Sequence, residues 1–88
     1  MSEYTKDPSA VLDYQINWGT WLDTDTISTS AWTAEAGITI DSDTSTTTTA
    51  TVWLSGGTTN RDYEVVNTIT TAAGRTDQRT ITIRCRDR

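Results

Sequence analysis

The sequence predicts an all-β protein, an antiparallel β-sandwich of about six to seven strands. Apolar and polar residues alternate with a period of two along several stretches, and turn-forming residues recur about every 8 to 12 residues. No stretch shows the period of an amphipathic helix. A period of two places apolar side chains on one face of a strand and polar side chains on the other, which is typical of antiparallel sheets with one solvated face.

The clearest strands form a predicted hairpin in the last quarter of the chain. Residues 62–70 and 78–86 flank a turn centred on Ala73-Gly74-Arg75. In the second strand apolar and polar residues alternate, and the apolar set consists of Ile81, Ile83 and Cys85. This pattern predicts a half-buried strand.

The first strand of the sandwich is predicted over residues 12–18. Its apolar face consists of Leu12, Tyr14, Ile16 and Trp18. Asp23-Thr24-Asp25 then predicts a turn, because aspartate side chains hydrogen-bond to nearby backbone groups.

A second strand is predicted over residues 26–33, where Ile27 and Trp32 are the large apolar residues. These two residues occupy positions of opposite parity, so they face the core together only if the strand contains a bulge or a bend. We place a bulge near residues 28–30.

A turn at Ala36-Gly37 leads into a short third strand. This strand is expected to begin at residues 38–40 and to end at residues 41–43. Residues 41–46 are considered as a separate seventh strand.

The next strand is predicted over residues 47–54, and Ser55-Gly56-Gly57 ends it. Its apolar face consists of Ala50, Val52 and Leu54. Trp53 therefore lies on the opposite face, where it covers an edge or joins an interface.

Tyr63 and Asn67 share a face of the 62–70 strand. Tyr63 opens this strand directly after a glycine-containing loop, where immunoglobulin-like and fibronectin-like sandwiches carry a tyrosine whose hydroxyl bonds back to the chain upstream. Asn67 needs hydrogen-bond partners if it is buried. The sandwich is therefore expected to be Ig-like or fibronectin-like.

The chain is divided into an N-terminal arm, residues 1–9, and one sandwich domain, residues 10–88. The arm is polar, lacks periodicity and contains Pro8, which biases Asp7 towards extended backbone. Such an arm either adds as a strand to a neighbouring sheet edge or is disordered, and the sequence leaves both open. A hydrophobic fraction of 34% predicts a thin core, which four tryptophans partly offset.

The net charge of −5 argues against nucleic-acid binding, because phosphate contacts need a concentrated basic surface. Residues 1–44 hold eight acids and one lysine, a charge of −7, and residues 45–88 hold four acids and six arginines, a charge of +2. A sandwich mixes strands from both halves, so a solvated surface is favoured over an electrostatic docking surface. No membrane segment or leader is recognised, and no membrane partner is expected.

Catalysis and cofactors are not expected. The chain has no histidine, and Cys85 is its single cysteine, which excludes Ser-His and Cys-His triads, the usual zinc ligands and an intrachain disulfide. Asp23/Asp25 and Asp41/Asp43 offer oxygen ligands for calcium but lack the glycine and the terminal glutamate of an EF-hand loop. Turn formation is the favoured explanation for both pairs.

Five segments stand in one order along nearly the whole chain: residues 6–14, 18–22, 25–27, 52–57 and 67–77. Taken together they resemble a family of small tailed-phage proteins described as fibre-tail adaptors. The resemblance implies an Ig-like virion component with no catalytic residues. We therefore expect a structural virion protein, assembled in the host cytoplasm, that links tail or neck to fibres.

The expected partners are other virion proteins and further copies of the same chain. A carbohydrate-binding sandwich with stacking tryptophans is the alternative from another class, and a head-completion or tail-terminator protein is a neighbouring one. Trp18 and Trp32 are assigned to the core, whereas Trp21 and Trp53 are left open between core and interface. Because exposed tryptophans and arginines are typical interface anchors, the candidate interface residues are Trp21, Trp53, Arg75, Arg79, Arg84 and Arg86.

Overall fold

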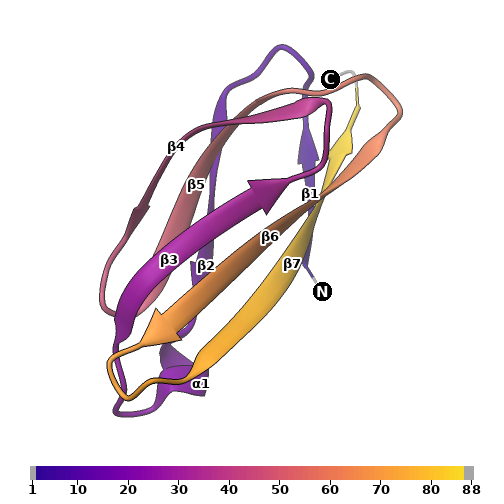
Figure 1. The fold of residues 1–88 in the computed structure, drawn as a ribbon. Coiled ribbons are helices and arrows are strands. Elements are labelled where there is room, and N and C mark those ends of the chain that lie inside the picture. The colour runs from indigo at the N-terminus through magenta and orange to yellow at the C-terminus, as the bar shows by residue number, and fades with distance from the viewer. Residues whose placement is uncertain (1, 87–88) are drawn as a thin grey trace.

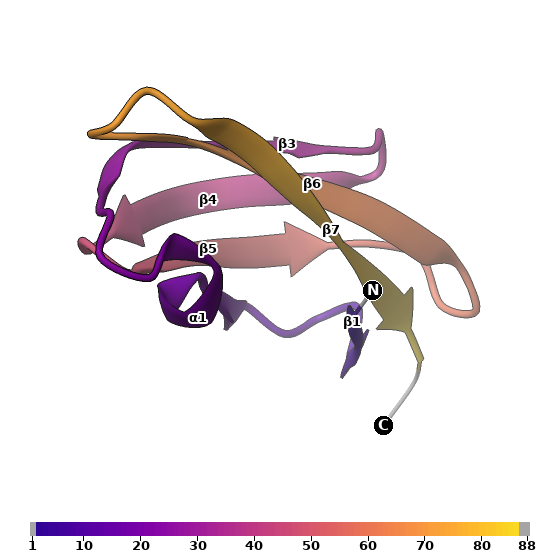
Figure 2. The ribbon, with the colours of Figure 1, turned by 90° about the horizontal axis from the view of Figure 1, so that it is seen from below.

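The computed structural model describes residues 2–86, in which seven strands form two packed sheets (Figures 1 and 2). The four-stranded sheet has the order β1 (Ser2–Lys6), β7 (Thr76–Cys85), β6 (Asp62–Thr71) and β3 (Ile27–Ala34). The three-stranded sheet has the order β2 (Leu12–Asn17), β5 (Thr49–Gly56) and β4 (Ile38–Ser45). The predicted all-β sandwich is confirmed.

The core lies between the two sheets and contains the apolar faces that the alternation predicts. Ala50, Val52 and Leu54 of β5 have no exposed surface, and Trp53 between them is 39% exposed. Trp18, directly after β2, is fully buried, and Trp32 of β3 is 9% exposed. The assignment of these last two tryptophans to the core is therefore confirmed.

The predicted hairpin is formed by β6 and β7, which pair antiparallel from Asp62 opposite Arg84 to Thr70 opposite Thr76. β7 begins two residues earlier than expected, at Thr76 rather than residue 78. Tyr63 opens β6 and accepts a 2.9 Å hydrogen bond at its hydroxyl from the backbone N–H of Thr58. The hydroxyl thus bonds back to the preceding loop, as predicted.

The predicted bulge in the second strand is present. The pairing of β3 with β6 shifts register between Ile27 and Thr29. The extra residue brings Ile27 and Trp32 to the same side, and both are buried.

β4 differs from the prediction in its length. It runs from Ile38 to Ser45, so the expected end at residues 41–43 is wrong, and residues 41–46 do not form a separate strand. A register shift between Ile40 and Ser42 allows β4 to keep pairing with β5 beyond the first aspartate. Aspartates disfavour strands on average, which is why the sequence suggested an end at this point.

The segment expected to be an arm contributes a strand to the same chain. Residues 2–6 form β1 and pair with β7 in parallel, from Ser2 opposite Ile81 to Lys6 opposite Cys85. The sandwich is therefore not purely antiparallel. Lys6 has no exposed surface, and its ammonium donates to the carbonyl oxygens of Asp7 at 2.9 Å and Gly56 at 2.8 Å. Met1 and residues 87–88 lie outside the described part.

One element was not predicted. Residues Gly19–Leu22 form α1, a single turn of helix close to the turn between β6 and β7 (Figure 1). It buries Leu22 and sets the ring of Trp21 edge-on against Trp18, with centroids 5.4 Å apart. Four residues are too few to show a helical period, so the pattern gave no signal.

Candidate interaction surfaces

The outer face of the three-stranded sheet is the first candidate surface. Its central strand places Trp53 outward, and the cross-strand neighbours of Trp53 are Asp13 on β2 and Ser42 on β4. β2, β4 and β5 contain no lysine or arginine but three aspartates, at positions 13, 41 and 43. Asp13 and Asp41 lie on the outer face, whereas Asp43 pairs with the buried Val52 and lies on the other face. The outer face, here called the Trp53 face, therefore combines one half-exposed indole with acidic and hydroxyl side chains.

The hydroxyl side chains of the Trp53 face follow from its sequence pattern. Thr51, next to Trp53 on the same face, lies opposite Gln15 and Thr44, and its hydroxyl oxygen accepts a 3.3 Å bond from the Gln15 amide. The Ser55 hydroxyl donates to Asp41 at 2.8 Å. Threonine and serine side chains cover most of the Trp53 face, because they fit a pleated sheet surface. The indole of Trp53 is therefore the largest apolar group on this face.

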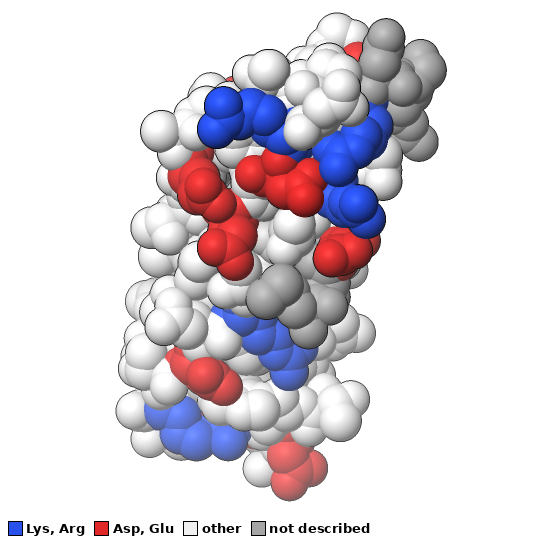
Figure 3. Space-filling view, turned by 90° about the vertical axis from the view of Figure 1, so that its right-hand side faces the viewer, with Lys and Arg blue, Asp and Glu red and all other residues white. Residues whose placement is uncertain are grey.

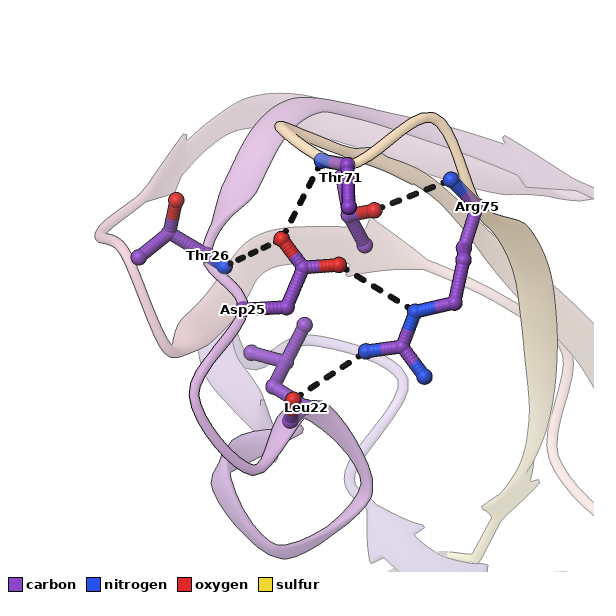
Figure 4. A network of polar contacts seen from close by, with 6 residues as sticks. Leu22, Asp25, Thr26, Thr71 and Arg75 are labelled. Atoms are coloured by element: carbon purple, nitrogen blue, oxygen red, sulfur yellow. Dashed lines mark hydrogen bonds and ion pairs between the residues drawn. The ribbon is translucent and has the colours of Figure 1, made fainter.

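A second candidate surface lies at the α1 end of the sandwich, where Arg75 joins the hairpin turn to the segment after α1 (Figure 4). The Nε of Arg75 donates to a carboxylate oxygen of Asp25 at 3.1 Å, and its Nη2 donates to the carbonyl oxygen of Leu22 at 3.1 Å. The guanidinium carbon lies 4.3 Å from the ring centroid of Trp21. Arg75 and Trp21 therefore bind one another within the chain, and Trp21 is half-buried against the core.

Asp25 holds the same turn from the other side. Its carboxylate accepts hydrogen bonds from the backbone N–H groups of Thr26 at 2.8 Å and Ala73 at 3.2 Å. The pKa of Asp25 is lowered to about 2, first by a side-chain hydrogen bond with Thr71 and then by the bonds from Thr26, Arg75 and Ala73, which outweigh partial desolvation. Asp25 is thus a structural group of the turn.

Arg79 lies on β7 and covers Trp18. Its guanidinium carbon is 4.2 Å from the indole centroid, and its Nη1 donates to the carbonyl oxygen of Asn17 at 3.3 Å. Beside it, an open groove of about 590 Å³ runs between β2 and β7. The groove is lined by residues that include Tyr4, Gln15, Asn17, Arg79 and Thr80.

Arg84 and Arg86 lie towards the other end of β7. Arg84 approaches a carboxylate oxygen of Glu3 at 3.4 Å, and Arg86 approaches Asp62 at 3.1 Å. Figure 3 shows this side of the molecule, where basic and acidic residues are interspersed. Partly exposed pairs of this kind contribute little to folding stability.

The structure therefore does not gather the six candidate residues into one surface. Trp53 stands alone on its face, Trp21 and Arg75 form one cluster, Arg79 lines the groove, and Arg84 and Arg86 form surface ion pairs. Asp25 was predicted only to form a local turn, and Lys6 was assigned no role, because the partners of both residues are distant in sequence. No pattern signals such contacts, because Asp25 and Arg75 are 50 positions apart.

The aspartate pairs considered for calcium lie in different settings. Asp25 is engaged by the hairpin turn, and Asp41 accepts from Ser55. Among residues 2–86, no three His, Cys, Asp or Glu side chains are grouped so as to hold a metal ion. Over the same described range, no helix is long and apolar enough to span a bilayer.

The described residues thus form a small two-sheet sandwich with one half-exposed tryptophan on an outer face and an open groove between β2 and β7. A comparison with known protein families identifies the family of the chain. The family model of the podophage GP4 fiber-tail adaptor protein gp77 matches residues 6–84, and the chain belongs to this family. No curated protein matches the chain. Membership assigns the chain to the structural components of tailed-phage particles and confirms the suspected family.

Proposed function

We propose that this protein links tail or neck components of a tailed phage to its fibres, and that the Trp53 face is the surface through which it does so. The adaptor family supports the first part. The second part depends on Trp53, an indole that is 39% exposed at the centre of a sheet without basic residues. Tryptophan is the residue most enriched among interface anchors, together with tyrosine and arginine.

The chemistry of the Trp53 face defines the partner surface. An indole with Asp13 opposite it, and with Asp41 on the neighbouring strand, attracts an arginine or lysine, because the cation stacks on the ring and pairs with the carboxylates. The partner is therefore a tail, neck or fibre protein that presents a basic side chain between apolar ones. The protein acts without catalysis and without a cofactor, as a virion component assembled in the host cytoplasm.

The proposal includes an Ig-like fold. In immunoglobulin constant domains one sheet contains strands A, B, E and D and the other contains C, F and G. Here β2, β5 and β4 follow the order B-E-D, and β3, β6 and β7 follow the order C-F-G. β1 joins the second sheet instead of the first. The tyrosine at the start of β6 occupies the corner position of strand F.

The carbohydrate-binding alternative has less support. It needs free indole faces, yet the ring of Trp21 is covered by the guanidinium of Arg75 at 4.3 Å. Among residues 2–86, Trp53 is the one tryptophan with a half-exposed ring that no arginine of the chain covers. No observation favours a head-completion or tail-terminator role over the adaptor role.

A pull-down with purified tail, neck and fibre proteins tests the proposal. The unmodified chain is expected to bind one of them, and Trp53→Thr is expected to weaken this binding by about 30-fold, the effect of a hot spot worth about 2 kcal/mol. Val66→Thr is the matched control, because Val66 is partly exposed on β6 in the other sheet. Equal binding by both variants would contradict the role of the Trp53 face, and binding to a defined sugar on a glycan array would favour the alternative.

A further inference from the structure

Only part of the outer edge of β7 is covered. β1 pairs with residues 81–85 of β7, whereas Thr76–Thr80 pair with β6 on one side and with no strand among residues 2–86 on the other. The groove of about 590 Å³ adjoins this uncovered part, since Arg79 and Thr80 line it. Unpaired backbone N–H and C=O groups along a sheet edge are a template for another strand.

The uncovered edge of β7 is more regular than the edge strand β4. β4, also an edge strand, carries Asp41 and Asp43 and a register shift between Ile40 and Ser42, and charges and bulges both discourage edge pairing. The 76–80 part of β7 has no proline and pairs with β6 without any register shift. The same part of β7 does carry Asp77 and Arg79, so it accepts only a strand that places opposite charges across from them.

The sequence of this edge is self-complementary. Thr76-Asp77-Gln78-Arg79-Thr80 has an acid and a base placed symmetrically about Gln78. When two such segments pair antiparallel with Gln78 opposite Gln78, each Asp77 lies opposite the Arg79 of the other copy. Opposite charges directly across an antiparallel pair are stabilising, and like charges are destabilising.

We propose that two copies of this chain join their Thr76–Thr80 edges in this register, about a two-fold axis at Gln78. The two four-stranded sheets then become continuous. This inference rests on the homo-oligomer expected of the adaptor and gives it a defined interface. A symmetric contact of this kind is closed and stops at two copies.

Arg79 is held in place for such pairing, whereas the Asp77 carboxylate accepts a 2.8 Å hydrogen bond from the backbone N–H of Gln78 in its own chain and exchanges this partner for the Arg79 of the other copy. Arg79 is held by stacking on Trp18 and by the carbonyl oxygen of Asn17, so its guanidinium is positioned before a partner arrives. Asp77 and Arg79 lie on the same face of β7, the face that looks towards the groove. The carboxylate of the incoming copy enters the groove between this guanidinium and the side chains of Gln15 and Asn17.

Charge reversal on the isolated chain tests the inference. Sedimentation equilibrium of the unmodified protein is expected to show a mass that rises with concentration towards about twice the 9.7 kDa of one chain. Asp77→Lys and Arg79→Glu each place like charges opposite one another, so each variant alone is expected to remain monomeric. Mixed together, they restore both opposite-charge pairs and are expected to form a 1:1 heterodimer.

Two controls show whether a loss of dimer comes from the changed edge of β7 rather than from misfolding or from the Trp53 face. Asp13→Lys reverses an exposed acid on the Trp53 face and is expected to leave the dimer intact. In the unmodified chain, hydrogen exchange at residues 76–80 is expected to slow as concentration rises, a readout that needs no variant. A mass of one chain at every concentration, or dimers of both single variants, overturns the inference. The pull-down with tail and fibre proteins would be unaffected by that failure, because it measures a different face.

Discussion

The indole N–H of Trp18 donates a 2.9 Å hydrogen bond to the side-chain oxygen of Asn67, and both residues are fully buried. Trp18 follows β2 in one sheet, and Asn67 lies on β6 in the other. The amide nitrogen of Asn67 donates in turn to the hydroxyl of Ser30 at 2.9 Å and to the carbonyl oxygen of Ala31 at 3.1 Å. A polar residue inside the core thus ties three segments together.

Replacement of Asn67 by leucine is expected to lower the free energy of unfolding by about 1 to 3 kcal/mol. The reason is that the indole N–H of Trp18 loses its acceptor while it stays buried. Urea denaturation followed by tryptophan fluorescence measures the change. Gln15→Ala, at an exposed position, is the control and is expected to stay within about 0.5 kcal/mol of the parent. A leucine variant as stable as the parent would show that the bond is not needed.

Gly57 is expected to tolerate a methyl group less well than Gly74. Both have positive φ, 96° and 90°, so alanine strains the backbone at either position. A Cβ at Gly57 also collides with the sulfur of Cys85, whereas a Cβ at Gly74 meets nothing within 4 Å. Thermal unfolding of the two alanine variants should therefore show Gly57→Ala to be less stable by about 1 to 3 kcal/mol, the usual cost of overpacking. Equal losses would mean that the Cys85 side chain moves aside without cost.

The alternation of apolar residues was sufficient to predict the sandwich, the hairpin and the bulge in β3. These features are local, because each depends on which face a side chain of one strand occupies. The hydrogen bond of Tyr63 was predicted from its place at the start of a strand after a glycine-containing loop, and the need of Asn67 for partners from its place on an otherwise apolar face.

The features that the sequence did not reveal depend on contacts between distant segments. β1 is short and polar, and its partner β7 lies at the other end of the chain, so no pattern within residues 2–6 indicates a strand. The burial of Lys6 follows from that pairing, because its ammonium reaches the carbonyl oxygen of Gly56. Arg75 and Arg79 were predicted to be interface residues from type alone, and only the fold shows that both stack on tryptophans.

The hydrogen bonds of the Asp25 carboxylate, here called the Asp25 clamp, are expected to make the free energy of unfolding fall at acidic pH. The folded-state pKa of Asp25 is about 2, below its ordinary value of 3.8, so its ionised form stabilises the fold at pH values above 3.8. This contribution is lost as the pH falls from 3.8 through 2. The melting temperature of Asp25→Asn should therefore lie below that of the parent at pH 7, and the gap should narrow towards pH 2. Asp23→Asn, in the same loop, should show no such narrowing, and a gap that persists unchanged at pH 2 would contradict the clamp.

The function proposed for this protein depends on protein contacts made by the Trp53 face. The most direct test replaces Trp53 by threonine in the phage and measures how much of the chain is incorporated into purified particles, together with the melting temperature of the isolated variant. We expect incorporation to be lost while the free energy of unfolding changes by less than about 1 kcal/mol, since Trp53 is half-exposed on a solvated face. Normal incorporation of a stably folded Trp53→Thr variant would contradict the claim.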